Sequence, residues 1–369
     1  MRSFAKVFCL SLLAVALLAG SAQARTVNGC KIKHHTSCHH KDLHGQDLHG
    51  AVLHHSVLHH INLRKANLRG ADLSYADLRE ADLRGADLRG ANLKGAKLHH
   101  YTAPKKKGAR TSATPACAPN CQGANLTGAN LTNANLTNAT LIAATVKSAN
   151  LTSATLTGAT LTGANLTSAN LTNATLTNAG PACFPNCQGA NLTSANLTSA
   201  NLTSANLGIA TLIGANLTGA ILNNADLFGA NLTGANLTSA NLSYASMSSV
   251  TLIAATLKNA NLTNAWLRNA TLTNATLTGA TLTGANLILA DLSYAGLTSA
   301  VLNGARLNNA DLTSADLTSA NLTSATLAYA TLTNATLIGA TLTNANLEGA
   351  TGCSTVTPTG TLNSYGCAS

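Results

Sequence analysis

The chain has few of the side chains on which most active sites and folded cores depend. Of its 369 residues, 3% are aromatic and 9% are charged, and no histidine occurs after residue 100. No Ser/His/Asp or Cys/His constellation for nucleophilic catalysis and no glycine-rich phosphate loop can be recognised. Beyond one N-terminal stretch, no segment is long and apolar enough to cross a bilayer. The sequence therefore predicts a non-catalytic protein without a transmembrane segment.

The chain is instead dominated by a five-residue repeat, Ala-(Asn/Asp/Thr)-Leu-x-x, which runs from about Asp42 to Glu348. Its central leucines recur in steps of five, with Val146 and Met247 as the two substitutes. A period of five matches neither a helix nor a strand, so the chain must turn every five residues and return above itself as a solenoid. We expect the Leu and Ala of each unit to point inward and the other three residues to face solvent.

The motif A-(D/N)-L-x-x, seen plainly in residues 71–90, resembles that of the pentapeptide-repeat proteins. The resemblance implies an all-β fold, the right-handed quadrilateral parallel β-helix, with four repeats in each coil. Coils of such a helix stack at the strand spacing of about 4.8 Å, which would give a rod roughly 65–70 Å long.

The N-terminus has the pattern of a secretion signal. Arg2 and Lys6 precede the apolar stretch VFCLSLLAVALLAG, and Ala22-Gln23-Ala24 supplies a small-residue cleavage pattern. We therefore expect a signal peptide over residues 1–24 and a mature protein that is exported, either periplasmic or secreted.

Two interruptions divide the repeat. The register slips by three residues between Leu98 and Cys121, and by one residue between Leu176 and Cys187, where a bulge could absorb it. The expected organisation is a basic His-rich repeat segment (25–100), a Pro/Lys-rich linker or loop (101–116), a long neutral β-helix (117–350) with a register break at 177–187, and a capping tail (351–369).

Eight cysteines remain after the expected removal of Cys9, and they form four close pairs at the edges and interruptions of the repeat. Disulfides at these places would staple the broken and terminal coils in an oxidising compartment, although the connectivity does not follow from the sequence. The expected pairs are Cys30/Cys38, Cys117/Cys121, Cys183/Cys187 and Cys353/Cys367.

Charge is concentrated near the N-terminus. Residues 25–115 carry sixteen Lys/Arg against seven Asp/Glu, a net charge of +9, whereas residues 116–369 carry four against five, a net charge of −1. This asymmetry favours attachment to an anionic polymer or lipid, and the alternative is a solvated surface with ladders of Asp and Arg. The candidate contacts are Arg64, Arg69, Arg79, Arg84, Arg89, Lys94, Lys105, Lys106 and Lys107.

All twelve histidines lie in the same segment, several as adjacent pairs. If regular coil extends down to Cys38, residues twenty apart stack, and four imidazoles meet on each of two faces. Such a group could bind Zn²⁺, Cu²⁺ or Ni²⁺, and the alternative is a polar His-rich cap. The candidate ligands are His34, His35, His54 and His55 on one face, and His39, His40, His59 and His60 on the other.

Outward apolar residues in the last block gather on one face if the coil contains four units. A stripe of this kind, bordered by Thr, Asn and Ser, is a candidate surface for a protein partner or for self-association, although scattered exposed apolar groups are normal. The stripe consists of Ile209, Phe228, Trp266, Ile288, Leu289 and Tyr329.

These patterns together predict an exported structural or interaction rod whose basic, His-rich end binds an anionic surface or a partner. A metal-binding protein is the alternative. Gyrase protection by DNA mimicry, an activity that the resemblance brings to mind, would need an acidic surface, which this chain lacks. Ice binding would need an uninterrupted column of Thr-x-Thr, whereas the TLT copies fall on successive faces.

Overall fold

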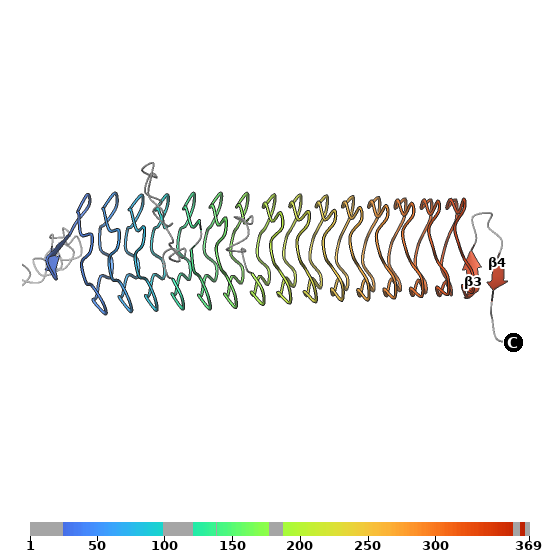
Figure 1. The fold of residues 1–369 in the computed structure, drawn as a ribbon, viewed down its shortest axis with the longest axis horizontal. Coiled ribbons are helices and arrows are strands. Elements are labelled where there is room, and N and C mark those ends of the chain that lie inside the picture. Colours follow the sequence, from blue (N-terminus) through green and yellow to red (C-terminus); the bar gives the residue numbers. More distant parts are fainter. Residues whose placement is uncertain (1–24, 99–120, 138, 177–186, 357–361, 366–369) are drawn as a thin grey trace, which may run out of the picture.

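The computed structural model describes residues 25–98, 121–137, 139–176, 187–356 and 362–365, with side chains up to residue 352. These residues form a single long rod of stacked coils (Figure 1). Its only extended strands are terminal: β1 (Arg25–Val27) pairs with β2 (Cys30–Ile32), and β3 (Gly352–Val356) pairs with β4 (Leu362–Tyr365), both antiparallel. Within these ranges there is no helix with the length and hydrophobicity that crossing a bilayer requires. The expected signal peptide and the linker at 101–116 lie outside the described residues.

Each coil contains four five-residue units, as expected. Parallel bridges join residues twenty apart, for example Asp42 to Asn62 and Asn62 to Asp82. Backbone hydrogen bonds accompany these bridges: the Asn62 N–H donates to the Lys41 carbonyl at 2.9 Å, and the Leu63 N–H donates to the Asp82 carbonyl at 2.8 Å. Every face of a coil is thus hydrogen-bonded to the coils before and after it, as in a parallel sheet.

The five-residue unit is a short bridge followed by a tight turn. The Ala66 N–H donates to the Leu63 carbonyl at 3.1 Å. The third residue of this turn, Lys65, has a φ of 55°. A positive φ is required at that position in type II turns, and Gly and Asn adopt it most easily. This requirement explains why the last position of the unit is so often Gly, Asn or Ser.

The Asn or Asp before each leucine stabilises the same turn. Asn125 Oδ1 accepts hydrogen bonds from the Thr127 N–H at 3.2 Å and from the Thr127 hydroxyl at 2.7 Å. The sequence Asn-Leu-Thr is therefore a local hydrogen-bonding unit, because an Asn side chain can bond to the backbone two residues later. The polar residues of each unit stabilise its turn, and the apolar residues form the core.

The core is a continuous column of Leu and Ala, and the predicted inward positions are confirmed. Leu262 and Ala260, in the middle of the rod, are 0% and 1% exposed. Burial of each leucine stabilises the fold by roughly 1.5–3 kcal/mol. Leu347, in the last coil, is 38% exposed because it lies where the column ends.

The two interruptions match the predicted slips of three and one residue, and each also removes whole five-residue units from the coil. Asp87 bridges to Asn125, a separation of 38 residues in place of 20, so 18 residues leave the coil and return. Asn165 bridges to Asn191, a separation of 26, so six residues leave it. The spacing of central residues in the sequence defines the register only up to whole five-residue units. Insertions of 18 and six residues therefore appear in the sequence as slips of three and one.

The coils before and after the first interruption stack directly on one another. Lys97 bridges to Asn135, and the Leu98 N–H donates to the Asn135 carbonyl at 2.8 Å. The basic segment and the neutral rod are therefore stacked coils of one continuous solenoid.

Both interruptions occur at the same corner of the rod. Bridges connect Lys97 through Asn135 and Thr155 to Thr175, so Leu98 and Leu176, after which the chain departs, lie in one column. The chain returns at Cys121 and Cys187, which occupy central positions in the neighbouring column.

Cys121 and Cys187 differ from the sequence-based expectation. Both carry free thiols, each 2% exposed, and burial raises the pKa of each thiol to about 12. Their sulfurs take the inward place of a leucine. Because both thiols are free, the predicted pairs with Cys117 and Cys183 are not formed. Those two residues and Cys367 lie outside the described residues, and so does the side chain of Cys353.

Candidate functional site

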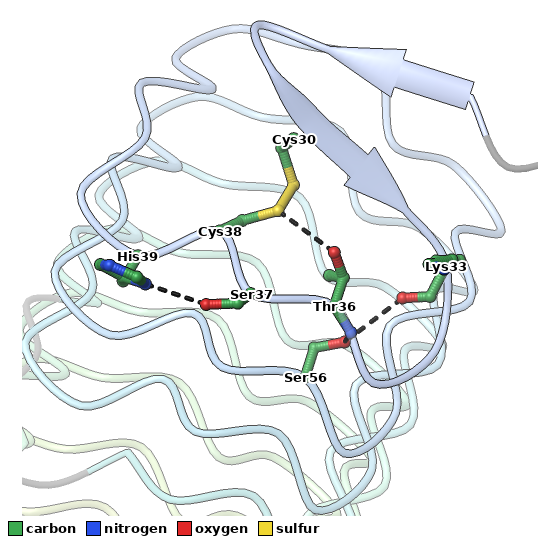
Figure 2. Close-up of a disulfide and its surroundings, with 7 residues drawn as sticks. All are labelled: Cys30, Lys33, Thr36, Ser37, Cys38, His39 and Ser56. Carbon is green, nitrogen blue, oxygen red and sulfur yellow. Dashed lines mark hydrogen bonds between the residues drawn. A yellow bond between two sulfur atoms is a disulfide. The ribbon is translucent and has the colours of Figure 1, made fainter.

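The N-terminal end of the rod is closed by the β1–β2 hairpin and a disulfide (Figure 2). Cys30 and Cys38 are bonded, with their Cα atoms 5.3 Å apart, which confirms the predicted pair. Cys38 occupies a central position, so the bond connects the hairpin to the interior of the first coil. The cap holds the first coil in place where no earlier coil could support it.

A buried pair of hydroxyl residues, which the sequence analysis did not identify, supports this end. Thr36 and Ser56 take the positions usually held by Ala and are 7% and 1% exposed. Ser56 donates its hydroxyl to the Lys33 carbonyl at 3.3 Å and accepts the Thr36 N–H at 3.1 Å (Figure 2). The hydroxyl thus bridges the turn between Lys33 and Thr36. In the sequence, this pair could have been recognised from Ser or Thr at a position that the repeat usually fills with Ala.

Regular coil extends to the first histidines. Ser37 bridges to Val57. The His35 N–H donates to the His54 carbonyl at 3.0 Å, and the His40 N–H donates to the His59 carbonyl at 3.3 Å. The first coil therefore places the early histidines directly against those twenty residues later.

The histidines form two arrays at adjacent corners. We call them the first histidine corner (His34, His35, His54 and His55) and the second histidine corner (His39, His40, His59 and His60). At the first corner, His34 stacks on His54 with ring centroids 5.2 Å apart, and His35 stacks on His55 at 5.1 Å. At the second, the pairs His39/His59 and His40/His60 stack at 5.1 and 4.7 Å. The predicted stacking is confirmed at both corners.

Three imidazoles at each corner have nitrogen atoms close enough to share a metal ion. In His34, His35 and His54, and again in His40, His59 and His60, one ring nitrogen from each residue lies within 4.8 Å of the others. Zinc binds imidazole nitrogen at about 2.0–2.1 Å, which places tetrahedral ligand atoms about 3.3 Å apart. The six side chains are exposed or half-buried, so modest rotations could bring them to that spacing.

Neighbouring side chains orient several of these rings, and the sequence analysis missed them. His54 Nδ1 lies 3.4 Å from an Asp72 carboxylate oxygen. Ser37 Oγ lies 2.9 Å from His39 Nδ1 (Figure 2). Tyr75 stacks on His55 with centroids 5.0 Å apart. The twenty-residue period could have predicted the contacts of Asp72 and Tyr75. It places the unit of Asp72 directly above the unit of His54, and Tyr75 directly above His55.

The environment of His59 shifts its titration. Partial burial lowers its pKa, and this effect outweighs the nearby Asp77, which favours the charged form. Burial alone would raise the pKa of Asp77, but hydrogen bonds from Arg79 hold it below its usual value.

The predicted arginines at 79, 84 and 89 are each paired within their own unit. Their Nε atoms donate to Asp77, Asp82 and Asp87 at 2.7, 2.8 and 2.8 Å. The side-chain hydrogen bond from Arg89 holds the pKa of Asp87 below its usual value. These pairs neutralise part of the basic surface, which is the ladder of Asp and Arg that the sequence left open as an alternative.

Two of the remaining predicted basic contacts, Arg64 and Arg69, lie at the other two corners of the same coils. Arg64 lies 4.0 Å from the Asp82 carboxylate, a much looser pair. Hydrogen bonds from Gly45 to the Arg64 carbonyl and from Gly50 to the Arg69 carbonyl stack single histidines, His44 and His49, beneath these arginines. Lys94 is exposed two coils above His54, in the column of the first histidine corner. Lys105, Lys106 and Lys107 lie outside the described residues.

The predicted apolar stripe is only partly distinct. Bridges from Asn206 through Trp266 to Asn346 confirm that its units share a column. Five of its six side chains are exposed, and Ile288 is half-buried. Tyr244 and Tyr294, in other columns, are 57% and 60% exposed, as much as Trp266 at 60%. Large exposed apolar residues are therefore not confined to the stripe.

Comparisons with known proteins agree with this architecture. A family model described as pentapeptide repeats matches residues 61–99, 120–179 and 186–351 in overlapping segments. None of the curated proteins compared with the chain matches significantly.

Several solved structures are similar to the chain. HetL, a pentapeptide repeat protein involved in heterocyst differentiation regulation in the cyanobacterium Nostoc sp. strain PCC 7120, is 26% identical, with 95% of this chain and 98% of HetL covered and a TM-score of 0.27. QnrB1, a plasmid-mediated fluoroquinolone resistance protein, is 18% identical over 43% of this chain and 85% of its own, with a TM-score of 0.30. A pentapeptide repeat protein of the Arabidopsis thaliana thylakoid lumen is 32% identical over 27% of this chain and 66% of its own, with a TM-score of 0.22. With its repeat, its four-unit coil and the matching family model, the chain belongs to the pentapeptide-repeat family and has its right-handed quadrilateral β-helix fold.

Proposed function

We propose that this protein is an exported, non-catalytic interaction rod whose N-terminal coils attach it to an anionic surface. One observation carries the proposal: the charge lies at one end of the rod. Residues 25–98 carry twelve Lys/Arg against seven Asp/Glu, a net charge of +5, whereas the described residues from 121 onward carry four against five, a net charge of −1. A charge asymmetry of this kind attracts polyanions and anionic membranes.

Arg64, Lys65 and Arg69 are the best candidates for the contact. They project from two adjacent corners of one coil, and none of them forms the tight within-unit pair seen for Arg84. Phosphate and carboxylate groups on a polymer or a lipid headgroup would supply the opposite charge. The basic surface does not suit DNA mimicry, which needs acidic side chains.

Export is part of the same proposal. A disulfide between Cys30 and Cys38 is typical of oxidising compartments. The signal-like pattern before Arg25 supports the same location.

Binding to immobilised lipopolysaccharide and to vesicles containing phosphatidylglycerol tests the proposal, with a metal chelator present throughout. We expect Arg64→Gln/Lys65→Gln/Arg69→Gln to weaken binding by about 100-fold at low salt, because surface cations near an anionic membrane each contribute about 1 kcal/mol. Binding by the unaltered protein should fall steeply as salt is raised. The two surfaces distinguish a glycolipid from a simple anionic lipid.

The matched control is Lys147→Gln/Lys258→Gln/Arg268→Gln, which removes the same number of charges from the neutral part of the rod. This variant should bind as well as the unaltered protein. Equal weakening by both triple variants would show that only total charge matters, and no binding by the unaltered protein would refute the proposal.

A further inference from the structure

We propose that the two histidine corners are separate binding sites for a divalent transition-metal ion of the zinc, copper or nickel type, each held by three imidazoles. The first site consists of His34, His35 and His54, and the second of His40, His59 and His60. The inference goes beyond the proposed function, because it concerns two different corners and a different ligand.

The solenoid itself builds both sites. Two adjacent units of the first coil end in His-His, and the units twenty residues later do so again. Backbone hydrogen bonds from His35 to His54 and from His40 to His59 fix the vertical register at 3.0 and 3.3 Å. Within a coil, His34 and His35 meet edge to face at 5.4 Å, and so do His59 and His60. Each corner is therefore a two-by-two array of imidazoles on a rigid backbone.

Three imidazole ligands favour metal ions of intermediate hardness. Neutral imidazole is a ligand for zinc, copper and nickel, whereas calcium and magnesium prefer oxygen. Three protein ligands leave a position for water or for a group from a partner. The ring nitrogens at each corner lie within 4.8 Å of one another. They need to move at most about 1.5 Å closer together to reach the spacing of tetrahedral zinc ligands.

A carboxylate is placed to orient one ligand at the first site. His54 Nδ1 faces Asp72 at 3.4 Å, which leaves Nε2 of that ring for the metal. Carboxylates commonly fix metal-bound histidines in this way. Asp72 Oδ1 also accepts the Ser74 N–H at 3.1 Å and the Asn92 side-chain amide at 3.1 Å, so the carboxylate is itself held in place.

The other two corners of the same coils provide a comparison within the molecule. His44 and His49 are each followed by glycine, and the residues stacked above them are Arg64 and Arg69. One imidazole beneath a guanidinium offers a metal ion a single ligand and an adjacent positive charge. We therefore expect metal ions at two of the four corners.

The test is a Zn²⁺ titration of the full chain by calorimetry, with equilibrium dialysis to count bound ions. The unaltered protein should bind two equivalents. His34→Thr/His54→Thr should remove one of them, and His40→Asn/His59→Thr should remove the other. These replacements are the residues that the repeat uses at the same positions, and Asn tolerates the φ of 56° at position 40.

His44→Thr/His49→Thr is the matched control, because it removes two histidines from the same coils and leaves both sites intact. It should retain two equivalents. Thermal unfolding followed by circular dichroism should show that all the variants remain folded, so that a lost equivalent reports on ligands. Binding of Cu²⁺ followed by electron paramagnetic resonance should show coupling to several imidazole nitrogens at each site.

Asp72→Asn refines the test. Asn keeps the Oδ1 acceptor for Ser74 but loses the negative charge beside His54. Loss of such an orienting carboxylate typically costs 10–100-fold in metal affinity, so the first site should weaken about tenfold or more and the second should not change. The proposal is overturned if the unaltered protein binds no Zn²⁺, if the control loses as much as the paired variants, or if the paired variants keep two equivalents.

Discussion

Replacing Leu262 by Asp is expected to unfold the coils around it. Leu262 is fully buried in the middle of the rod, between the leucines one coil before and one coil after it. Loss of a buried leucine costs about 2–5 kcal/mol, and a buried unpaired carboxylate adds several more. Because neighbouring coils stabilise each other in a solenoid, the damage should spread to both sides.

Trypsin provides a sensitive measurement, because Lys258 and Arg268 flank the substituted unit and few other cationic residues occur in this part of the rod. The variant should be cleaved rapidly at both residues, while the unaltered protein resists. Asn261→Asp is the matched control, since the repeat itself uses Asp at this outward position in Asp291 and Asp311. Equal resistance of the Leu262→Asp variant would contradict the assignment of inward positions.

Removal of the Cys30–Cys38 disulfide should have the next largest effect, confined to the N-terminal end. The bond closes a loop with a sequence separation of eight residues, and both sulfurs are buried. Chain entropy in the unfolded state gives such a crosslink a stabilising effect of about 2–3 kcal/mol. In Cys30→Ala/Cys38→Ala, the hairpin and the first coil should therefore open more often.

Amide hydrogen exchange measures this opening directly. Exchange at Cys38 and Leu43, whose N–H groups donate to the second coil, should accelerate strongly in the double variant, while mid-rod amides such as Leu262 keep their rates. Cys187→Ala, which removes a buried free sulfur elsewhere, should leave the N-terminal amides unchanged. Uniform acceleration along the whole rod would show that the disulfide stabilises more than the cap.

The sequence was sufficient to predict the solenoid and its inward residues because the physics repeats in every unit. A leucine such as Leu262 sees the same neighbours as the leucines twenty residues before and after it, so one correct unit predicts the others. The stacking of His39 and His40 against His59 and His60 followed from the same period. Thr36 and Ser56 were missed because they depart from the Ala that the repeat uses at those positions.

The interruptions were predicted in place but not in extent. The sequence spacing between Leu98 and Cys121 does not tell how many of the intervening five-residue units belong to the coil. The structure shows that the two residues occupy consecutive units. The free thiols of Cys121 and Cys187 do not follow from their central positions, because Cys38 also occupies a central position and is bonded to Cys30. The pairing of Arg79, Arg84 and Arg89 with Asp also depends on side-chain rotamers that the repeat pattern leaves open.

The continuity of the rod across both interruptions can be tested by a distance between spin labels at Arg69 and Thr193. Bridges place the two units in one column, five coils apart, at a backbone separation of about 24 Å. The labels require Arg69→Cys and Thr193→Cys in a chain whose Cys117, Cys183, Cys353 and Cys367 are replaced by Ser. The buried thiols of Cys121 and Cys187 should not react. A single narrow distribution at five coil spacings is the predicted result. A broad distribution, or one near the roughly 30 Å that unbroken winding of all 124 intervening steps would give, would contradict the account.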